Sequence, residues 1–122
     1  MTAHPSILVV DDDYSGRAML SLSLKQAGFP VQAAADGEEA LRFLSERRYD
    51  WLITDAKMRP MDGFALSQAA KRIQPDLRVV MISAVYTERD AGGYPIEKFF
   101  AKPVPVDQLV DWIFRGRGTT AL

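Results

Sequence analysis

Five short apolar runs, separated by stretches of helical periodicity, constrain the fold of this chain more than any other feature. The runs are nearly continuous rather than alternating, which is typical of strands buried on both faces of a sheet. They cover residues 7–10, 31–34, 51–53, 79–82 and 99–101. Strands that alternate with helices form parallel sheets through right-handed crossovers. The 122 residues therefore predict one α/β domain with a parallel sheet covered by helices on both faces.

Capping patterns mark several helix ends. Gly28 is the expected stop of the first helix, because glycine readily ends a helix in the left-handed conformation. Asp36 with Glu39 three residues later is a capping-box pattern at the start of the second helix. Asp62 is expected to cap the third helix.

The segment 84–98 and the C-terminal tail are the two regions without a clear helical pattern. Gly92, Gly93 and Pro95 interrupt the first of them, since glycine raises the entropy cost of ordering and proline removes a backbone donor. We predict a short or irregular fourth helix there, with Tyr86 and Tyr94 as contacts for a partner. The tail 116–122 has no apolar period and is predicted to be mobile.

Composition and charge exclude several classes of protein. The chain has no cysteine, so disulfides and thiolate metal sites are excluded, and its formal net charge is −1. A balanced charge argues against direct binding of nucleic acid. The start "MTAHPS" does not resemble a signal peptide, and no apolar run approaches the roughly 20 residues of a membrane span. We therefore expect a cytoplasmic protein without membrane contact.

Polar side chains collect where the predicted strands end. In an open parallel sheet, the carboxyl ends of the strands lie along one edge, where ligands bind. The residues at these ends are Asp11, Asp12, Asp13, Asp55, Ser83 and Lys102. The sequence therefore predicts that carboxylates, a hydroxyl group and an ammonium group meet at one edge of the fold.

The three adjacent carboxylates of Asp11, Asp12 and Asp13 need a physical explanation. Like charges about 4 Å apart repel by roughly 4 kcal/mol at an effective dielectric constant near 20. A bound Mg²⁺ ion would offset this repulsion, because it prefers oxygen ligands and keeps several waters. Side chains alternate along a strand, so we do not expect all three carboxylates to point to one site.

Taken together, the motifs "ILVVDDD", "LITDAKMRPMDG", "VVMISA" and "FFAKP", in this order, resemble the response regulator receiver domain of two-component signal transduction. The resemblance covers residues 6–115 and extends to the chemotaxis regulators of that family. It implies a doubly wound, flavodoxin-like fold with a five-stranded parallel sheet in the order 2-1-3-4-5 and about five helices.

The resemblance also implies the chemistry. Asp55 resembles the phosphoacceptor, whose carboxylate takes a phosphoryl group from a phosphohistidine on a sensor histidine kinase or a histidine phosphotransfer protein. Lys102 would form an ion pair with the phosphoryl group, and the Ser83 hydroxyl would bond to one of its oxygens. Phe99 matches the aromatic position that turns inward when Ser83 moves. Such a domain switches the binding of a downstream protein and is not an enzyme, although it assists its own phosphorylation and dephosphorylation.

The same resemblance implies a site for Mg²⁺ or Mn²⁺. Asp12 would be a direct ligand, Asp11 a ligand through water, and Asp55 and the backbone carbonyl of Lys57 further ligands. Asp13 matches an acidic position that does not bind the ion. Charge neutralisation and alignment are what phosphoryl transfer mainly requires.

Two departures from the family pattern concern the loops of the site. Arg59 lies between Met58 and Pro60, where relatives have proline directly after the methionine. Lys57 and Val85, each two residues after a site residue, match positions that flank the path of the attacking water. Neither side chain offers a general base, so we predict slow hydrolysis of the phosphoryl group.

Three alternative functions remain open from the sequence. One is a receiver-like interaction module that is never phosphorylated. Another is a haloacid-dehalogenase-type phosphatase with Asp11 as its nucleophile, although the late acidic pair that such enzymes need would have to come from a predicted helix. The third is a flavodoxin-like flavin binder, which the three carboxylates after the first strand disfavour because they would repel phosphate. Identification of the nucleophile, Asp11 or Asp55, separates the phosphatase from the receiver.

Overall fold

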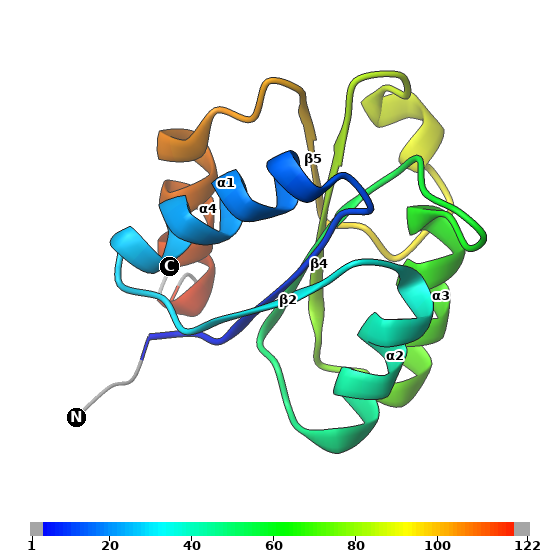
Figure 1. Ribbon diagram of the computed structural model, residues 1–122, viewed down its shortest axis with the longest axis horizontal. Helices are drawn as coiled ribbons and strands as arrows, with labels where there is room; N and C mark the ends of the chain where they lie inside the picture. The colour runs from blue at the N-terminus through cyan, green and yellow to red at the C-terminus, as the bar shows by residue number, and fades with distance from the viewer. Residues whose placement is uncertain (1–3, 119–122) are drawn as a thin grey trace.

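The computed structural model describes residues 4–118, which form a parallel five-stranded sheet with helices on both faces (Figure 1). The strands are β1 (Ile7–Val10), β2 (Val31–Ala34), β3 (Trp51–Asp55), β4 (Arg78–Ser83) and β5 (Lys98–Ala101). Their spatial order is β2-β1-β3-β4-β5. This order confirms the α/β fold and the topology that the family resemblance implied.

Four α-helices and one 3₁₀ turn connect the strands within the described part of the chain. They are α1 (Tyr14–Gln26), α2 (Gly37–Glu46), α3 (Gly63–Ile73), the 3₁₀ turn η1 (Glu88–Ala91) and α4 (Val106–Gly118). The expected caps are present: Asp36 Oδ1 accepts from the Glu39 amide at 2.8 Å, and Asp62 Oδ1 accepts from the Ala65 amide at 2.8 Å. Gly28 follows α1 with φ of 101°, a conformation that glycine adopts without strain.

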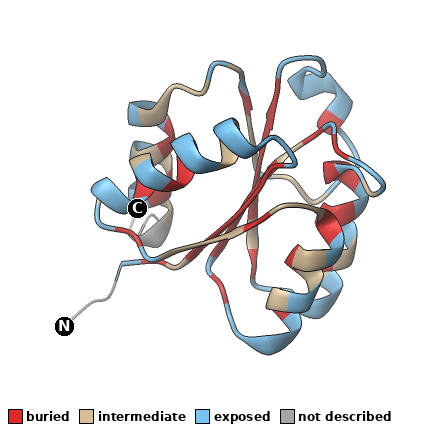
Figure 2. Ribbon diagram, in the orientation of Figure 1, coloured by how far each residue is buried: buried red, intermediate tan, exposed pale blue. Residues whose placement is uncertain are grey.

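The core lies on both faces of the sheet, which explains the continuous apolar runs. Ile7 and Val9 pack with the residues of α1 and α4, whereas Leu8 and Val10 pack with those of α2 and α3. Figure 1 shows these two helix pairs on opposite sides of the sheet, and Figure 2 shows the buried strands between exposed outer helix surfaces. Every residue of β1 therefore has a buried side chain.

The fourth crossover contains only the four-residue turn η1, which confirms the predicted short and irregular fourth helix. The Thr87 amide donates to Asp90 Oδ2 at 2.8 Å and so caps the turn. Gly93 has φ of 87°, which a helix does not accept. The ring of Phe64, at the start of α3, contacts Tyr86 and Tyr94 at centroid distances of 5.2 and 4.9 Å. These aromatic contacts hold the segment against α3 in place of a longer helix.

The last helix, α4, extends to Gly118, three residues past the boundary at 115 that the sequence indicated. Residues 119–122, the rest of the predicted mobile tail, lie outside the described residues. No helix within residues 4–118 combines the length and the apolar character that crossing a membrane requires.

Candidate functional site

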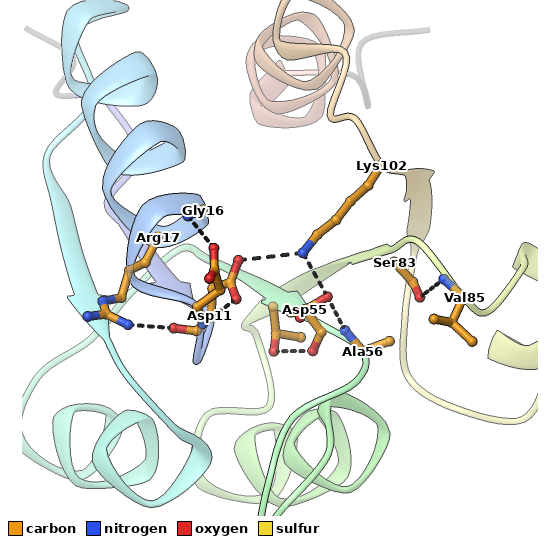
Figure 3. Close-up of polar contacts among 10 residues, drawn as sticks. Asp11, Gly16, Arg17, Asp55, Ala56, Ser83, Val85 and Lys102 are labelled. Atoms are coloured by element: carbon orange, nitrogen blue, oxygen red, sulfur yellow. Dashed lines mark hydrogen bonds and ion pairs between the residues drawn. The ribbon is translucent and has the colours of Figure 1, made fainter.

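The carboxyl ends of four strands bring the predicted polar residues to one edge of the sheet, as the sequence analysis expected (Figure 3). The strand register aligns these ends. Val10 of β1 pairs with Thr54 of β3, and Asp55 pairs with Ile82 of β4. Asp11 follows directly after β1, Ser83 ends β4, and Lys102 follows directly after β5.

Three carboxylates form the centre of this edge. Asp11, Asp12 and Asp55 each place one carboxylate oxygen so that the three atoms lie within 4.8 Å of one another. Asp11 is buried, Asp55 is partly buried and Asp12 is exposed. The cluster therefore extends from the buried end of the site to the surface, where solvent can reach it.

Asp13 has a structural role that separates it from these three. Its side chain is the N-cap of α1 and accepts from the Gly16 amide at 2.8 Å. Its own amide donates to Asp11 Oδ1 at 2.9 Å, which fixes the Asp11 carboxylate. Of the three adjacent aspartates, Asp11 and Asp12 thus belong to the acidic cluster and Asp13 caps α1. A negative charge is favoured at the N-terminus of a helix, which explains the third aspartate.

Lys102 is the cation of the site. Its Nζ lies 3.6 Å from Asp11 Oδ2 and 3.4 Å from Asp55 Oδ1. Burial alone would lower the pKa of Lys102, but the charges of Asp11 and Asp55 outweigh this effect and raise the pKa. The ammonium group therefore stays charged between the two carboxylates.

Asp55 is held by its neighbours in an environment that disfavours its charge. Burial raises the pKa of Asp55 and the charge of Asp11 raises it further, while Lys102 and the Ala56 amide lower it without cancelling the increase. That amide donates to Asp55 Oδ1 at 3.1 Å, and the buried Thr54 hydroxyl donates to the Asp55 carbonyl at 2.9 Å. A bound cation beside Asp55 would favour the charged form of its carboxyl group.

The donor set fits a divalent metal ion of the magnesium class. Mg²⁺ binds carboxylate oxygens and retains waters, so one or two protein carboxylates from such a cluster are sufficient. Oxygens of Asp11, Asp12 and Asp55 within 4.8 Å of each other are close enough to share one ion directly or through water. Lys57 lies in the exposed turn two residues after Asp55, and the ligand role of its carbonyl stays a prediction.

Ser83 and Phe99 lie on the β4–β5 side of the site. The Ser83 side chain is buried, and its Oγ accepts from the Val85 amide at 3.0 Å and from the Tyr86 amide at 2.9 Å. Phe99 is partly buried and packs against a small core cluster that contains Phe64. The structure thus places Ser83 directly before the irregular segment, and Phe99 against the cluster that includes Ala91 of that segment.

Several residues that shape the site were not predicted from the sequence. Arg17 Nη1 donates to the Asp11 carbonyl at 2.8 Å and so fixes the loop after β1. Gly16 and Gly63 leave space: a Cβ at Gly16 would lie 2.7 Å from Asp11 Oδ2, and a Cβ at Gly63 would lie 2.2 Å from the Asp55 carbonyl oxygen. Aspartate is a preferred N-cap residue, so the position of Asp13 directly before the first helix is the sequence signal that could have identified its capping role.

Comparison with known proteins gives one consistent family. The family described as the response regulator receiver domain matches residues 7–114. Sporulation initiation phosphotransferase F of Bacillus subtilis is 33% identical over 109 residues, which are 86% of this chain and 87% of that protein. The transcriptional regulatory protein PrrA of Mycobacterium tuberculosis is 36% identical over 123 residues, 96% of this chain and 53% of the regulator. The chain thus spans about half the length of that regulator.

Solved structures with similar folds support the same grouping. The chemotaxis response regulator CheY4 of Vibrio cholerae, crystallised at low pH, superposes with a TM-score of 0.85 and 29% identity, covering 93% of this chain and 98% of that chain. The response regulator TrrA of Thermotoga maritima, solved in complex with Mg²⁺ and BeF, has a TM-score of 0.82 and 26% identity, with coverage of 91% and 97%.

Proposed function

The chain belongs to the response regulator receiver family, and from this premise we propose that it accepts a phosphoryl group on Asp55. The observation that carries the proposal is the position of Lys102, whose Nζ lies within 3.6 Å of both Asp11 and Asp55. A cation in this position can pair with a phosphoryl oxygen as soon as the group is attached to Asp55. The site therefore combines a nucleophile with a preorganised positive charge.

The transfer uses the groups of this site in a defined way. The donor is a phosphohistidine on a sensor histidine kinase or a histidine phosphotransfer protein. An Asp55 carboxylate oxygen attacks phosphorus, the bond from phosphorus to the imidazole nitrogen breaks, and the nitrogen retains the electron pair. Mg²⁺ or Mn²⁺ held by Asp11, Asp12 and Asp55, with the Lys57 carbonyl as a further ligand, would neutralise the charge of the phosphoryl oxygens.

Ser83 is the residue through which we expect the phosphoryl group to alter the rest of the fold. A hydroxyl group has two acceptor sites and one donor. The amides of Val85 and Tyr86 already donate to its oxygen at 3.0 and 2.9 Å, so the hydroxyl proton is available for a phosphoryl oxygen. Movement of Ser83 toward the phosphoryl group would pull on the start of the segment 84–98, and Phe99 would move into the space that Ser83 leaves.

The lifetime of the phosphoryl group depends on side chains at the rim. Lys57 and Val85 are both exposed, Val85 with 62% of its surface accessible. Neither can deprotonate a water molecule at neutral pH, because lysine is charged and valine is apolar. We therefore expect slow hydrolysis, which would suit a switch whose signal outlasts its contact with the kinase.

A second function deserves a test, namely a receiver-like module that binds partners without phosphorylation. Such a module would have the same acidic cluster, with the same raised pKa of Asp55, as a receiver that is phosphorylated. The two functions differ in whether Asp55 reacts. A histidine kinase or histidine phosphotransfer protein as partner, a downstream protein partner and the cytoplasmic location stay predictions.

Incubation with phosphoramidate and Mg²⁺, followed by borohydride reduction and peptide mass spectrometry, tests the proposal. Reduction converts a phosphorylated aspartate to homoserine, so the modified position can be identified. We expect the change at Asp55 and at no other acidic residue. Modification of Asp11 instead would support the phosphatase alternative, and the absence of any modification would support the unphosphorylated module.

A further inference from the structure

A cavity of about 400 Å³ lies beside the acidic cluster, between α1 and the connection from β5 to α4. Its charged lining residues are Asp11, Asp13, Asp55 and Lys102. Apolar side chains line most of the remaining wall, among them Met19, Leu20, Ile53, Ile82 and Val104. Cavities of this size, largely apolar and with a few polar groups at one end, are typical of sites for small molecules.

Gly16 connects the two parts of this cavity. It lies in the first turn of α1, and Met19 and Ser23 follow on the next two turns along the same wall. A Cβ at Gly16 would lie 2.7 Å from Asp11 Oδ2 and 3.2 Å from Asp13 Oδ2. Any side chain there would therefore crowd the carboxylates and narrow the passage from the acidic cluster to the apolar wall.

The phosphoryl group alone does not account for a largely apolar cavity of about 400 Å³. A phosphoryl group is small and charged, and Lys102 together with the acidic cluster is sufficient for it. Apart from the charged side chains at the acidic cluster, all the residues that line the cavity are uncharged, and most of them are apolar. Its chemistry therefore matches a neutral, apolar group that arrives attached to the phosphoryl group.

We propose that this cavity binds the apolar acyl group of small acyl phosphates and makes them preferred phosphodonors over acetyl phosphate. The inference rests on the proposed phosphorylation of Asp55 and names a class of donor for that reaction. The phosphoryl end of the donor lies at Lys102 and the acidic cluster, and the acyl end lies against Met19, Leu20 and Val104.

The chemistry of the step favours an acyl phosphate over other phosphate esters. The bond from an Asp55 carboxylate oxygen to phosphorus forms, and the bond from phosphorus to the acyl oxygen of the donor breaks. The electron pair stays on the released carboxylate, and no proton has to move. Because donor and product are both acyl phosphates, the exchange is close to balanced in free energy, whereas an alcohol ester would have to release a far poorer leaving group.

Phosphorylation rates with benzoyl phosphate and acetyl phosphate test the proposal, measured by intact mass with Mg²⁺. We expect the wild-type rate with benzoyl phosphate to exceed that with acetyl phosphate by roughly tenfold, the lower end of the discrimination that an apolar pocket gives. Ser23→Leu should fill the cavity and bring the ratio of the two rates, measured in the same variant, close to one. Met19→Ala, a milder change at an exposed residue, should lower the ratio in the same direction. Leu22→Ala is the control, because Leu22 is exposed on the same helix and does not line the cavity.

Binding of unreactive analogues gives a second readout that does not depend on turnover. In the presence of Mg²⁺, benzoylphosphonate should shift the NMR signals of the Met19 and Val104 methyl groups, and acetylphosphonate should leave them unchanged. Equal rates with both donors and no shift of these methyl groups would overturn this inference but not the proposed function. The cavity would then more plainly fit a side chain of a protein that donates the phosphoryl group. Failure of both donors to phosphorylate Asp55 would overturn this inference and the proposed function together.

Discussion

Gly63 is the residue whose replacement should most clearly show how closely the start of α3 packs against the loop after Asp55. It is the first residue of α3 and follows the Asp62 cap. A Cβ at this position would lie 2.2 Å from the Asp55 carbonyl oxygen and 3.0 Å from Ala56 Cα and Met81 Cε. Ordinary contacts between carbon and carbonyl oxygen are about 3.3 Å or longer. Gly63→Ala therefore forces the loop after Asp55 and the start of α3 apart by roughly 1 Å.

The cost of this change follows from three contributions. Overpacking in a rigid region costs about 1–3 kcal/mol. Displacement weakens the bond from the Gly63 amide to the Ala56 carbonyl, 2.8 Å long, which adds about 1 kcal/mol. The lower backbone entropy of alanine in the unfolded chain offsets roughly 0.4–1 kcal/mol. We expect a net destabilisation of about 2 kcal/mol, which corresponds to a decrease in Tm of roughly 8 °C for a domain of this size.

Thermal unfolding of Gly63→Ala, with Gly92→Ala as the matched control, measures this effect. Gly92 has φ of −60°, and a Cβ there would approach its nearest neighbour, the Arg89 carbonyl, at 3.4 Å. The control should therefore melt at or slightly above the wild-type temperature. Because Gly63 contacts the Asp55 backbone, its variant should also be phosphorylated more slowly than the control. A Gly63→Ala variant that melts within about 1 °C of wild type would refute the packing argument.

Three further predictions concern the metal, the pH dependence and the lifetime of the phosphoryl group. Mg²⁺ at about 100 times its Kd should stabilise the wild-type protein by roughly 2.7 kcal/mol, and Asp12→Ala should lose most of that gain in the same thermal titration; an equal gain would exclude Asp12 as a ligand. The pKa of Asp55 is raised above its usual value of 3.8, so without divalent metal this carboxyl lowers stability as the pH rises through and above 3.8. Asp55→Asn should therefore raise the free energy of unfolding relative to wild type, and by more at pH 7 than at pH 3, as measured by denaturant unfolding at the two pH values. The same gain at both pH values would contradict the raised pKa. Lys57→Asn and Val85→Glu should each change the decay rate of phosphorylated protein followed by intact mass, and unchanged decay in both would show that these side chains do not govern hydrolysis.

The elements of the fold could be predicted from sequence where a single local signal determined them. The apolar runs marked all five strands, most clearly β1, β3 and β4, whose residues are almost all buried because helices cover both faces of the sheet. Asp36 and Asp62 marked helix starts because a cap acts within one turn. The strand order, in contrast, depends on contacts between distant segments and came from the family resemblance alone.

The end of α4 shows how tertiary contacts override a local signal. The missing apolar period predicted a mobile tail from residue 116, yet the helix continues to Gly118. Arg78 donates to the Gly116 carbonyl, and a Cβ at Gly116 would lie 2.7 Å from the Trp51 ring. Glycine therefore lets the helix approach Trp51 closely, and its low helix propensity is compensated by this packing.

For the candidate site, the sequence indicated which residues meet but not how they are held. Asp11, Asp55, Ser83 and Lys102 could be placed together because each lies at a strand end. The bonds from the Val85 and Tyr86 amides to the Ser83 hydroxyl could not be predicted, because they depend on the path of an irregular loop. The cavity beside Gly16 likewise depends on the distance between α1 and the connection to α4, which no local pattern specifies.

Intact-mass measurement of the chain with a small phosphodonor and Mg²⁺, in wild type and in Asp55→Asn, tests the central claim most directly. The variant keeps the shape of the side chain and removes the nucleophile, so any difference reports on the reaction itself. We predict that the wild-type protein gains the mass of one phosphoryl group, that removal of Mg²⁺ by a chelator prevents the gain, and that Asp55→Asn shows none under any condition. A gain in Asp55→Asn at the wild-type rate would contradict the assignment of Asp55 as the phosphoacceptor.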